Sequence, residues 1–104
     1  MGQFDVYENK NLETNQAIPY LLDIQADLLA SLKTRVVVPL VHIESVGKTI
    51  KHLNPRFKVK QITVFMSTAE LAGIPTSFLG SKVASLKDRR DEIIAALDFL
   101  FTGF

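Results

Sequence analysis

The sequence predicts an α+β fold that is mainly β: a small, curled antiparallel sheet with one helix laid on it. Two observations predict this fold. Short segments that alternate polar and apolar residues, or that are rich in β-branched residues, fill the chain as far as Gly80. After that point, apolar residues recur at the three- and four-residue steps of an amphipathic helix. At 104 residues, the chain has the size of one domain.

Two short strands are predicted near the start. Residues 3–7 alternate polar and apolar side chains, and residues 18–24 are again strand-like, with Pro19 suited to a strand start or a sheet edge. The polar residues 8–16 between them predict a long turn. Residues 28–32 leave two alternatives open, a short helical turn or an apolar surface loop.

The strongest strand signal lies in residues 36–43, where five of the eight residues are β-branched. Pro39 interrupts this segment and predicts a bulge or bend, as a small curled barrel needs at its corners. A final strand is expected over residues 74–80, closing on a glycine.

A hairpin is predicted between these strands, with arms at residues 56–59 and 62–66. Neither Lys60 nor Gln61, the two residues between the arms, favours the positive φ that two-residue turns need, so the residues themselves give the turn little support. The arms supply the expected inward row: Phe57, Val59, Ile62, Val64 and Met66.

A helix is expected over about residues 87–102, at the end of a single domain that spans residues 1–104. Asp88 and Asp91 suit the helix start, where carboxylates meet unpaired amides, and Gly103 suits the helix end. The stripe, apolar except for Arg90, runs through Val83, Leu86, Arg90, Ile93, Ile94, Leu97, Leu100, Phe101 and Phe104.

The composition excludes several classes of protein. The chain has no cysteine, which excludes disulfides and thiolate chemistry, and it has no apolar run of the ~20 residues that a membrane span needs. Hydrophobic residues make up 47% and charged residues 22%, as in ordinary globular domains, which argues against disorder. The start of the sequence lacks the features of a secretion signal, so we expect a cytoplasmic protein.

The net charge of +1 is unevenly distributed. Residues 1–32 carry one basic and five acidic residues, residues 33–69 seven basic and one acidic, and residues 70–104 four basic and five acidic. The basic middle segment fits a site for nucleic acid or for an acidic peptide, but a solvated rim is the more usual role of such charges.

The residues present offer little catalytic chemistry. His42 and Glu44 lie two apart on a predicted strand and so share a face, which fits either an acid–base dyad or a surface charge pair. We find no zinc-ligand spacing and no phosphate-binding loop, and we expect no catalytic residue, metal site or cofactor.

Large apolar residues occur at two unusual places. Phe101 and Phe104 lie at the chain end, where polar residues are more usual, and Leu28 and Leu29 are adjacent, so both cannot easily point inward. Each group either packs into the core or forms an apolar patch for a partner.

The sequence resembles the CcdB family of toxins over essentially its full length. The order and spacing of several short motifs carry the resemblance: Gln3-Phe4, Val6-Tyr7, Asp23-x-Gln25-x-Asp27 before the leucine pair, Val38-Pro39-Leu40, Ile74-Pro75-x-Ser77-x-x-Gly80, Val83-Ala84-x-Leu86 and Phe101-x-Gly103. The resemblance implies the SH3-like barrel with a C-terminal helix that CcdB shares with MazF.

The resemblance also implies a function. Family members are homodimeric toxins of type II toxin–antitoxin modules that bind the A subunit of DNA gyrase and trap its cleaved-DNA complex. They perform no bond chemistry. A CcdA-type antitoxin neutralises them, and the toxin–antitoxin complex represses its own operon, so contact with nucleic acid is expected only through that complex. No membrane association is expected.

The resemblance assigns two surfaces. Positions that contact gyrase in the family are occupied here by Leu28, Leu29, Asp98, Phe101, Thr102, Gly103 and Phe104. Thr102 replaces a family tryptophan. Tyr7 and Val64 match antitoxin-binding positions, and Lys58 and Lys60, from the basic segment, are expected to help hold an acidic antitoxin tail.

Two other functions stay open from the sequence. An endoribonuclease toxin of the same barrel fold would need acid–base groups and a basic groove, for which His42, Glu44 and the basic segment are the candidates. A peptide-binding module of the same fold would need neither.

Overall fold

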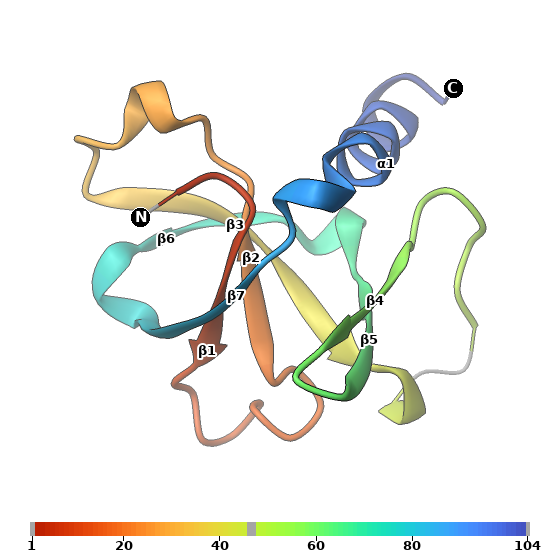
Figure 1. Cartoon of the computed structure of the whole chain (residues 1–104), viewed down its shortest axis with the longest axis horizontal. Helices are drawn as coiled ribbons and strands as arrows, with labels where there is room; N and C mark the ends of the chain where they lie inside the picture. The colour runs from red at the N-terminus through yellow and green to blue at the C-terminus, as the bar shows by residue number, and fades with distance from the viewer. Residues whose placement is uncertain (1, 46–47, 104) are drawn as a thin grey trace.

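The computed structural model describes residues 2–45 and 48–103, which form seven strands, one α-helix and five short 3-10 turns (Figure 1). The strands are β1 (Asp5–Asn9), β2 (Tyr20–Asp23), β3 (Thr34–His42), β4 (Arg56–Val59), β5 (Ile62–Met66), β6 (Ala72–Pro75) and β7 (Leu79–Ser85). The helix α1 spans Arg90–Thr102. The 3-10 turns are η1 (Asp27–Leu29), η2 (Ile43–Ser45), η3 (Thr68–Glu70), η4 (Thr76–Phe78) and η5 (Lys87–Arg89).

The strands form one antiparallel sheet in the order β4-β5-β3-β2-β1-β7, and β6 also pairs with β3. The sheet curls into a half-barrel, and α1 lies along its upper side in Figure 1. This architecture confirms the predicted fold class, α+β and mainly β, with a curled antiparallel sheet and a C-terminal helix.

The strand β3 pairs with two different strands along one of its edges. Residues 40–42 pair with β5 and residues 34–37 with β6, while the other edge pairs with β2 without a register shift. Pro39 lies between the two paired segments, and its carbonyl accepts a hydrogen bond from the Ser67 amide at 2.9 Å. Of the predicted bulge or bend at Pro39, the bulge is wrong, because pairing with β2 continues through this residue. The proline, which cannot donate, marks the position where β3 changes neighbour.

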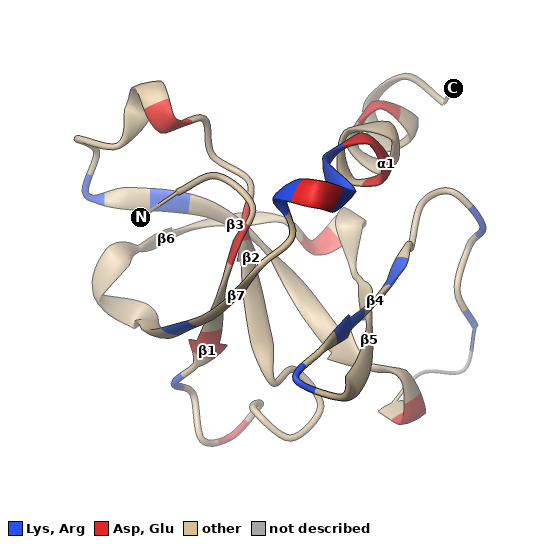
Figure 2. Ribbon diagram, in the orientation of Figure 1, with Lys and Arg blue, Asp and Glu red and all other residues tan. Residues whose placement is uncertain are grey.

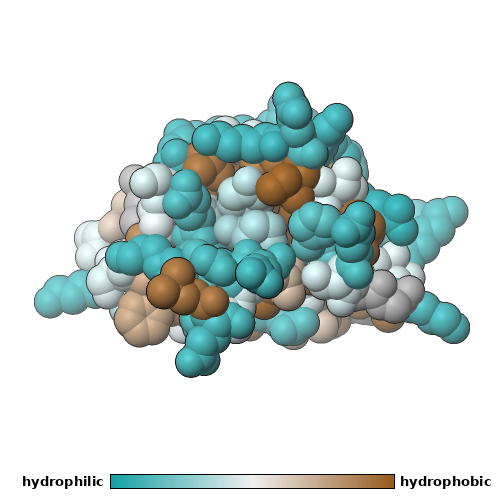
Figure 3. Space-filling model, turned by 90° about the horizontal axis from the view of Figure 1, so that it is seen from below, coloured by the Kyte–Doolittle hydropathy of each residue, from teal (hydrophilic) through white to brown (hydrophobic). Residues whose placement is uncertain are grey.

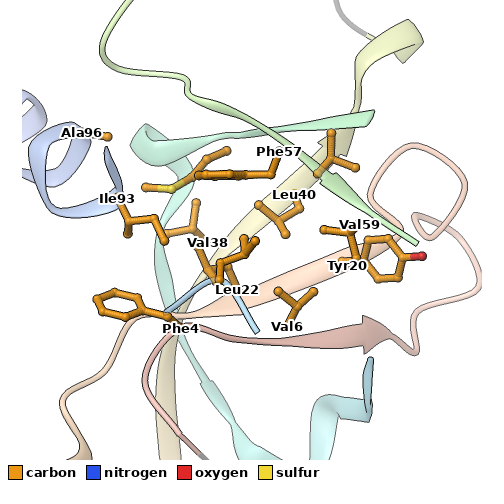
Figure 4. Packing of buried hydrophobic residues seen from close by; sticks show 13 residues of the cluster. Phe4, Val6, Tyr20, Leu22, Val38, Leu40, Phe57, Val59, Ile93 and Ala96 are labelled. Carbon is orange, nitrogen blue, oxygen red and sulfur yellow. The ribbon is translucent and has the colours of Figure 1, made fainter. Parts of the chain in front are cut away.

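The main hydrophobic core fills the inside of the curl (Figure 4). Val6, Leu22 and Val38 come from adjacent strands, Phe57 faces them from β4, and Ile93 of α1 packs against the core at the left of the view. Complete burial of one such side chain stabilises a fold by about 1.5–3 kcal/mol, so this cluster supplies most of the driving force for folding. The predicted inward row of the hairpin is confirmed, since Phe57, Val59, Val64 and Met66 are buried and Ile62 packs against them.

A second, smaller cluster lies on the opposite face of the same strands. Tyr7 and Val37, the chain neighbours of two core residues, pack there with Leu79, Leu21 and Ile74. Successive side chains of a strand point to opposite faces, so a sheet that is covered on both sides needs apolar residues at consecutive positions. Burial raises the pKa of the Tyr7 hydroxyl, and the negative charges of two nearby aspartates add to the effect.

The strand expected over residues 74–80 does not exist as one element. Strand β6 ends at Pro75, η4 intervenes, and β7 begins at Leu79. Gly80 lies near the start of β7 instead of closing a strand, and a Cβ atom there would come within 2.9 Å of Glu8 on β1. The glycine is needed because the two strands approach closely, not because the chain turns.

The helix begins later than its apolar stripe suggested. Val83 belongs to β7 and Leu86 precedes η5, so both pack against the barrel without being helical. The residue before α1 is Arg89, with Asp91 in the first helical turn. Gly103 has φ of 79°, and its amide donates to the Phe99 carbonyl at 2.9 Å, which confirms the predicted glycine cap.

The first strand also starts later than expected, because Phe4 has φ of 70° and extended pairing begins only at Asp5. Among the residues that the structure describes, no helix is long and apolar enough to span a membrane. From below, the surface is mainly hydrophilic, with separate small apolar patches (Figure 3).

Candidate functional site

An exposed leucine pair follows β2. Leu28 and Leu29 lie on η1 and are 93% and 46% exposed. The alternative left open for this segment is thus resolved: it begins as a 3-10 turn and stays on the surface, with Leu32 also half exposed. Contact of large apolar side chains with water is unfavourable, so a partner that covers them forms a complex of lower free energy.

A buried ion pair lies beneath the start of this segment. The Arg35 side chain contacts the Asp23 carboxylate at 2.7 Å (Nη2 to Oδ2) and donates to it from Nε at 2.9 Å. Both residues are at most 1% exposed. Burial raises the pKa of the Asp23 carboxyl, and the hydrogen bond from Arg35 offsets this only in part. The pair ties β2 to β3 just before η1.

Two further polar side chains hold η1. Gln25 donates from Nε2 to the Leu29 carbonyl at 3.1 Å, and its Oε1 accepts from the Val36 amide at 3.0 Å. Asp27 accepts from the Gln3 amide at 2.7 Å. The Asp23-x-Gln25-x-Asp27 pattern therefore acts as a scaffold that presents the leucine pair. Sequence reasoning noted this pattern without finding its role.

The C-terminal turn of α1 presents a second apolar group. Phe101 is 71% exposed. Thr102 and Gly103 are exposed as well, and the Thr102 hydroxyl donates to the Asp98 carbonyl at 2.6 Å. Phe104, the last of the predicted gyrase-contacting positions, lies outside the described residues.

A shallow groove of about 430 Å³ joins the two groups. Leu29 and Phe101 both line it, although they are far apart in the sequence. In Figure 1, η1 and the end of α1 lie along the upper side of the molecule. Sequence reasoning missed the rest of the apolar lining, because no motif connects these residues: Ile24, Ala26, Leu32, Val36, Leu71 and Leu97.

A model of the CcdB protein family matches residues 3–103. The chain belongs to the CcdB family. It is accordingly a toxin of the toxin–antitoxin type. The match covers almost the whole chain, including η1, the groove and the last turn of α1.

The residues expected to bind the antitoxin divide into two kinds in this CcdB-family chain. Lys58 on β4 and Lys60 in the hairpin turn are exposed. Tyr7 is 4% exposed, and Val64 is fully buried in the main core. A partner cannot reach the Val64 side chain in this conformation, so only the lysines are available for direct contact.

The expected common face of His42 and Glu44 is wrong. Strand β3 ends at His42, and Glu44 lies on η2, where its backbone amide donates to the His42 Nδ1 at 3.2 Å. The contact is thus between a side chain and the backbone, not between two side chains that could exchange a proton. Within residues 2–45 and 48–103, no three histidine or acidic side chains lie close enough together to hold a metal ion.

Proposed function

We propose that this CcdB-family toxin binds the A subunit of DNA gyrase and traps the cleaved-DNA complex. The proposed contact residues are Leu28, Leu29, Asp98, Phe101, Thr102, Gly103 and Phe104. Toxicity arises from holding gyrase on broken DNA, so the toxin itself breaks no bond and needs no cofactor. The target is in the cytoplasm, where the toxin acts.

One observation supports this proposal most directly: Leu29 and Phe101, which are far apart in the sequence, line one groove and are 46% and 71% exposed. A monomeric protein gains nothing from keeping such side chains in water. Complete burial of a leucine or phenylalanine is worth about 1.5–3 kcal/mol, and a partner that covers the exposed part of these side chains gains a share of this, so they are suited to anchor a protein partner.

Thr102 alters the chemistry of the proposed contact. A tryptophan at this position can stack on a partner cation for up to about 2 kcal/mol, and threonine cannot. The Thr102 hydroxyl already donates within α1. Aromatic contact with gyrase therefore falls to Phe101 and Phe104, and the preference for a particular gyrase is expected to differ from that of relatives with tryptophan.

We also propose that the toxin is a homodimer with the ends of its two α1 helices near the two-fold axis, so that one gyrase-binding face includes residues of both copies. A CcdA-type antitoxin neutralises the toxin through a separate surface that includes Lys58 and Lys60. The toxin contacts the operator DNA only within the toxin–antitoxin complex.

Removal of residues 102–104 tests the gyrase proposal. The truncated toxin should lose growth inhibition on induction, and purified protein should no longer trap double-strand breaks when incubated with gyrase and DNA. Its melting temperature should change by a few degrees at most, because Thr102 and Gly103 are exposed.

Leu12→Asp is the matched control, because Leu12 is an 86% exposed leucine on the loop after β1 and outside the proposed contact. This variant should remain toxic. Killing by the truncated chain would refute the proposal, and a large fall in its melting temperature would assign the chain end to packing. Incubation of the toxin with RNA separates the other toxin class, since a gyrase poison leaves RNA intact.

A further inference from the structure

Strand β4 is one end of the sheet, and its outward edge is open. The Met66 amide donates to the Pro55 carbonyl at 2.9 Å, so residue 55 faces β5. Backbone groups alternate along an antiparallel strand, which directs those of Phe57 and Val59 toward β5 and those of Arg56 and Lys58 away from it. The Arg56 carbonyl accordingly accepts from the Arg89 side chain at 3.4 Å instead of from a strand.

The open edge is strongly cationic. Arg56 and Lys58 on β4 and Lys60 in the turn are exposed, and none of them takes part in an ion pair among the described residues. The preceding loop adds Lys48 and Lys51, and no acidic residue occurs between positions 45 and 69. Figure 2 shows blue without red along β4 and the described part of this loop.

Other occupants fit this edge poorly. A second copy of β4 would bring like charges into direct opposition, which is destabilising. Single-stranded nucleic acid binds through aromatic stacking as well as charge, but the exposed side chains of the hairpin are those of Arg56, Lys58, Lys60, Gln61 and Thr63, none of them aromatic. An extended acidic peptide satisfies both the backbone groups and the charges.

We propose that β4 binds an extended acidic segment of a partner protein as an additional strand of the sheet. The outward N–H groups of Arg56 and Lys58 and the Lys58 carbonyl pair with the segment's backbone, and acidic side chains of the segment lie beside Arg56 and Lys58. This inference rests on the proposed antitoxin surface and specifies how that surface binds: by strand addition, with charge selecting the partner.

Titration of the full chain with a blocked octapeptide of four Glu-Val repeats tests the inference. Lys58→Pro removes the outward N–H without disturbing the ladder to β5, and Lys58→Gln is the matched control that loses only the charge. Loss of one exposed charge should weaken binding about two- to fivefold. The proline variant should bind at least about tenfold more weakly than the glutamine variant.

Two further peptides keep the test decisive if Lys58→Pro does not fold. A Glu-Val peptide N-methylated at its four central residues has no backbone donors there on either edge and should not bind the wild-type chain. A Lys-Val peptide should not bind either. Equal binding by the proline and glutamine variants or by the methylated peptide would refute strand addition, and binding of single-stranded RNA but not of the acidic peptide would identify the edge as a nucleic-acid site.

These outcomes are independent of the gyrase proposal. Lys58→Pro should still inhibit growth in cells without an antitoxin, because the groove between η1 and α1 is unchanged. If charge reversal at Lys58 abolishes antitoxin binding while proline there does not, the antitoxin surface stands and the strand-addition mode fails.

Discussion

Polar side chains in the interior determine where the exposed apolar ones are presented. Asp23 and Arg35 form an ion pair that is almost wholly excluded from water, and Gln25 beside it bridges η1 and β3. Removing two charges from water is costly, so a buried ion pair serves to hold two segments in one arrangement more than to stabilise the fold. Here it fixes β2 against β3 at the point where the chain leaves the sheet for Leu28 and Leu29.

Replacement of Arg35 should therefore be severe. Arg35→Met leaves the Asp23 carboxylate buried without a counter-charge and should lower the free energy of unfolding by about 3–5 kcal/mol near pH 7, as measured by chemical denaturation. The unpaired carboxyl has a still higher pKa than in the wild type, so it takes up a proton in the folded state as the pH falls. The loss should thus be smaller at about pH 5 than at pH 7.

The double replacement Asp23→Leu with Arg35→Met is the control, because it removes both charges and should cost less than Arg35→Met alone. A small loss of unfolding free energy for Arg35→Met, or a loss that does not change with pH, would contradict this account, because a buried carboxylate without its counter-charge would then not be costly.

At the scale of elements, the β4–β5 hairpin adopts a turn that its two turn residues do not favour, because core packing of its arms outweighs their backbone preference. Its arms have the predicted bounds, yet Lys60 and Gln61 both adopt positive φ, 48° and 69°. A two-residue turn of this type matches the twist of paired strands, which explains its use. Both residues are strained there, and the burial of Phe57 and Val59 in the main core compensates for that strain.

Relief of this strain should stabilise the fold. Lys60→Asn combined with Gln61→Gly introduces the residue pair that adopts positive φ most readily, and the free energy of unfolding should rise by about 1–2 kcal/mol. Lys58→Asn is the control. It makes the same kind of change within β4, where the backbone is extended, and should not stabilise the chain. No gain in the turn variant would mean that the turn is unstrained.

At the scale of the molecule, the two proposed surfaces are separate. The end of α1 lies at the top of Figure 1 and the β4–β5 turn at the bottom. The groove between η1 and α1 is lined mainly by apolar residues, whereas the exposed side chains of β4 are basic. Two partners that differ in chemistry can thus be recognised by different faces of a small protein.

Charge reversal should separate the two activities. Lys58→Glu with Lys60→Glu should weaken binding of a CcdA-type antitoxin while toxicity persists, because the substitutions repel an acidic tail and leave the groove intact. Calorimetric titration with the antitoxin and growth inhibition on induction measure the two effects. Lys10→Glu with Arg90→Glu, at exposed basic residues outside β4 that form no ion pair among the described residues, is the control for net charge. Unchanged antitoxin affinity in the β4 variant would refute the surface.

Local patterns predicted most elements. The β-branched run became β3, the hairpin arms became β4 and β5, and the apolar stripe became α1 with its glycine cap, because period and cap chemistry depend on neighbours in the chain. The division of residues 74–80 between β6, η4 and β7 could not be predicted this way, since it depends on which strand lies next to each residue.

The sequence by itself determined the fold class, the family likeness and which large apolar residues lack a place in a core pattern. Only the tertiary structure decided that Leu29 and Phe101 share one groove, that Val64 is out of a partner's reach and that β4 is a cationic edge. The reason is physical. The periodicity of apolar residues indicates which side chains are buried, and it depends only on near neighbours in the chain. A shared surface requires contacts between distant segments, and these form only when the sheet curls.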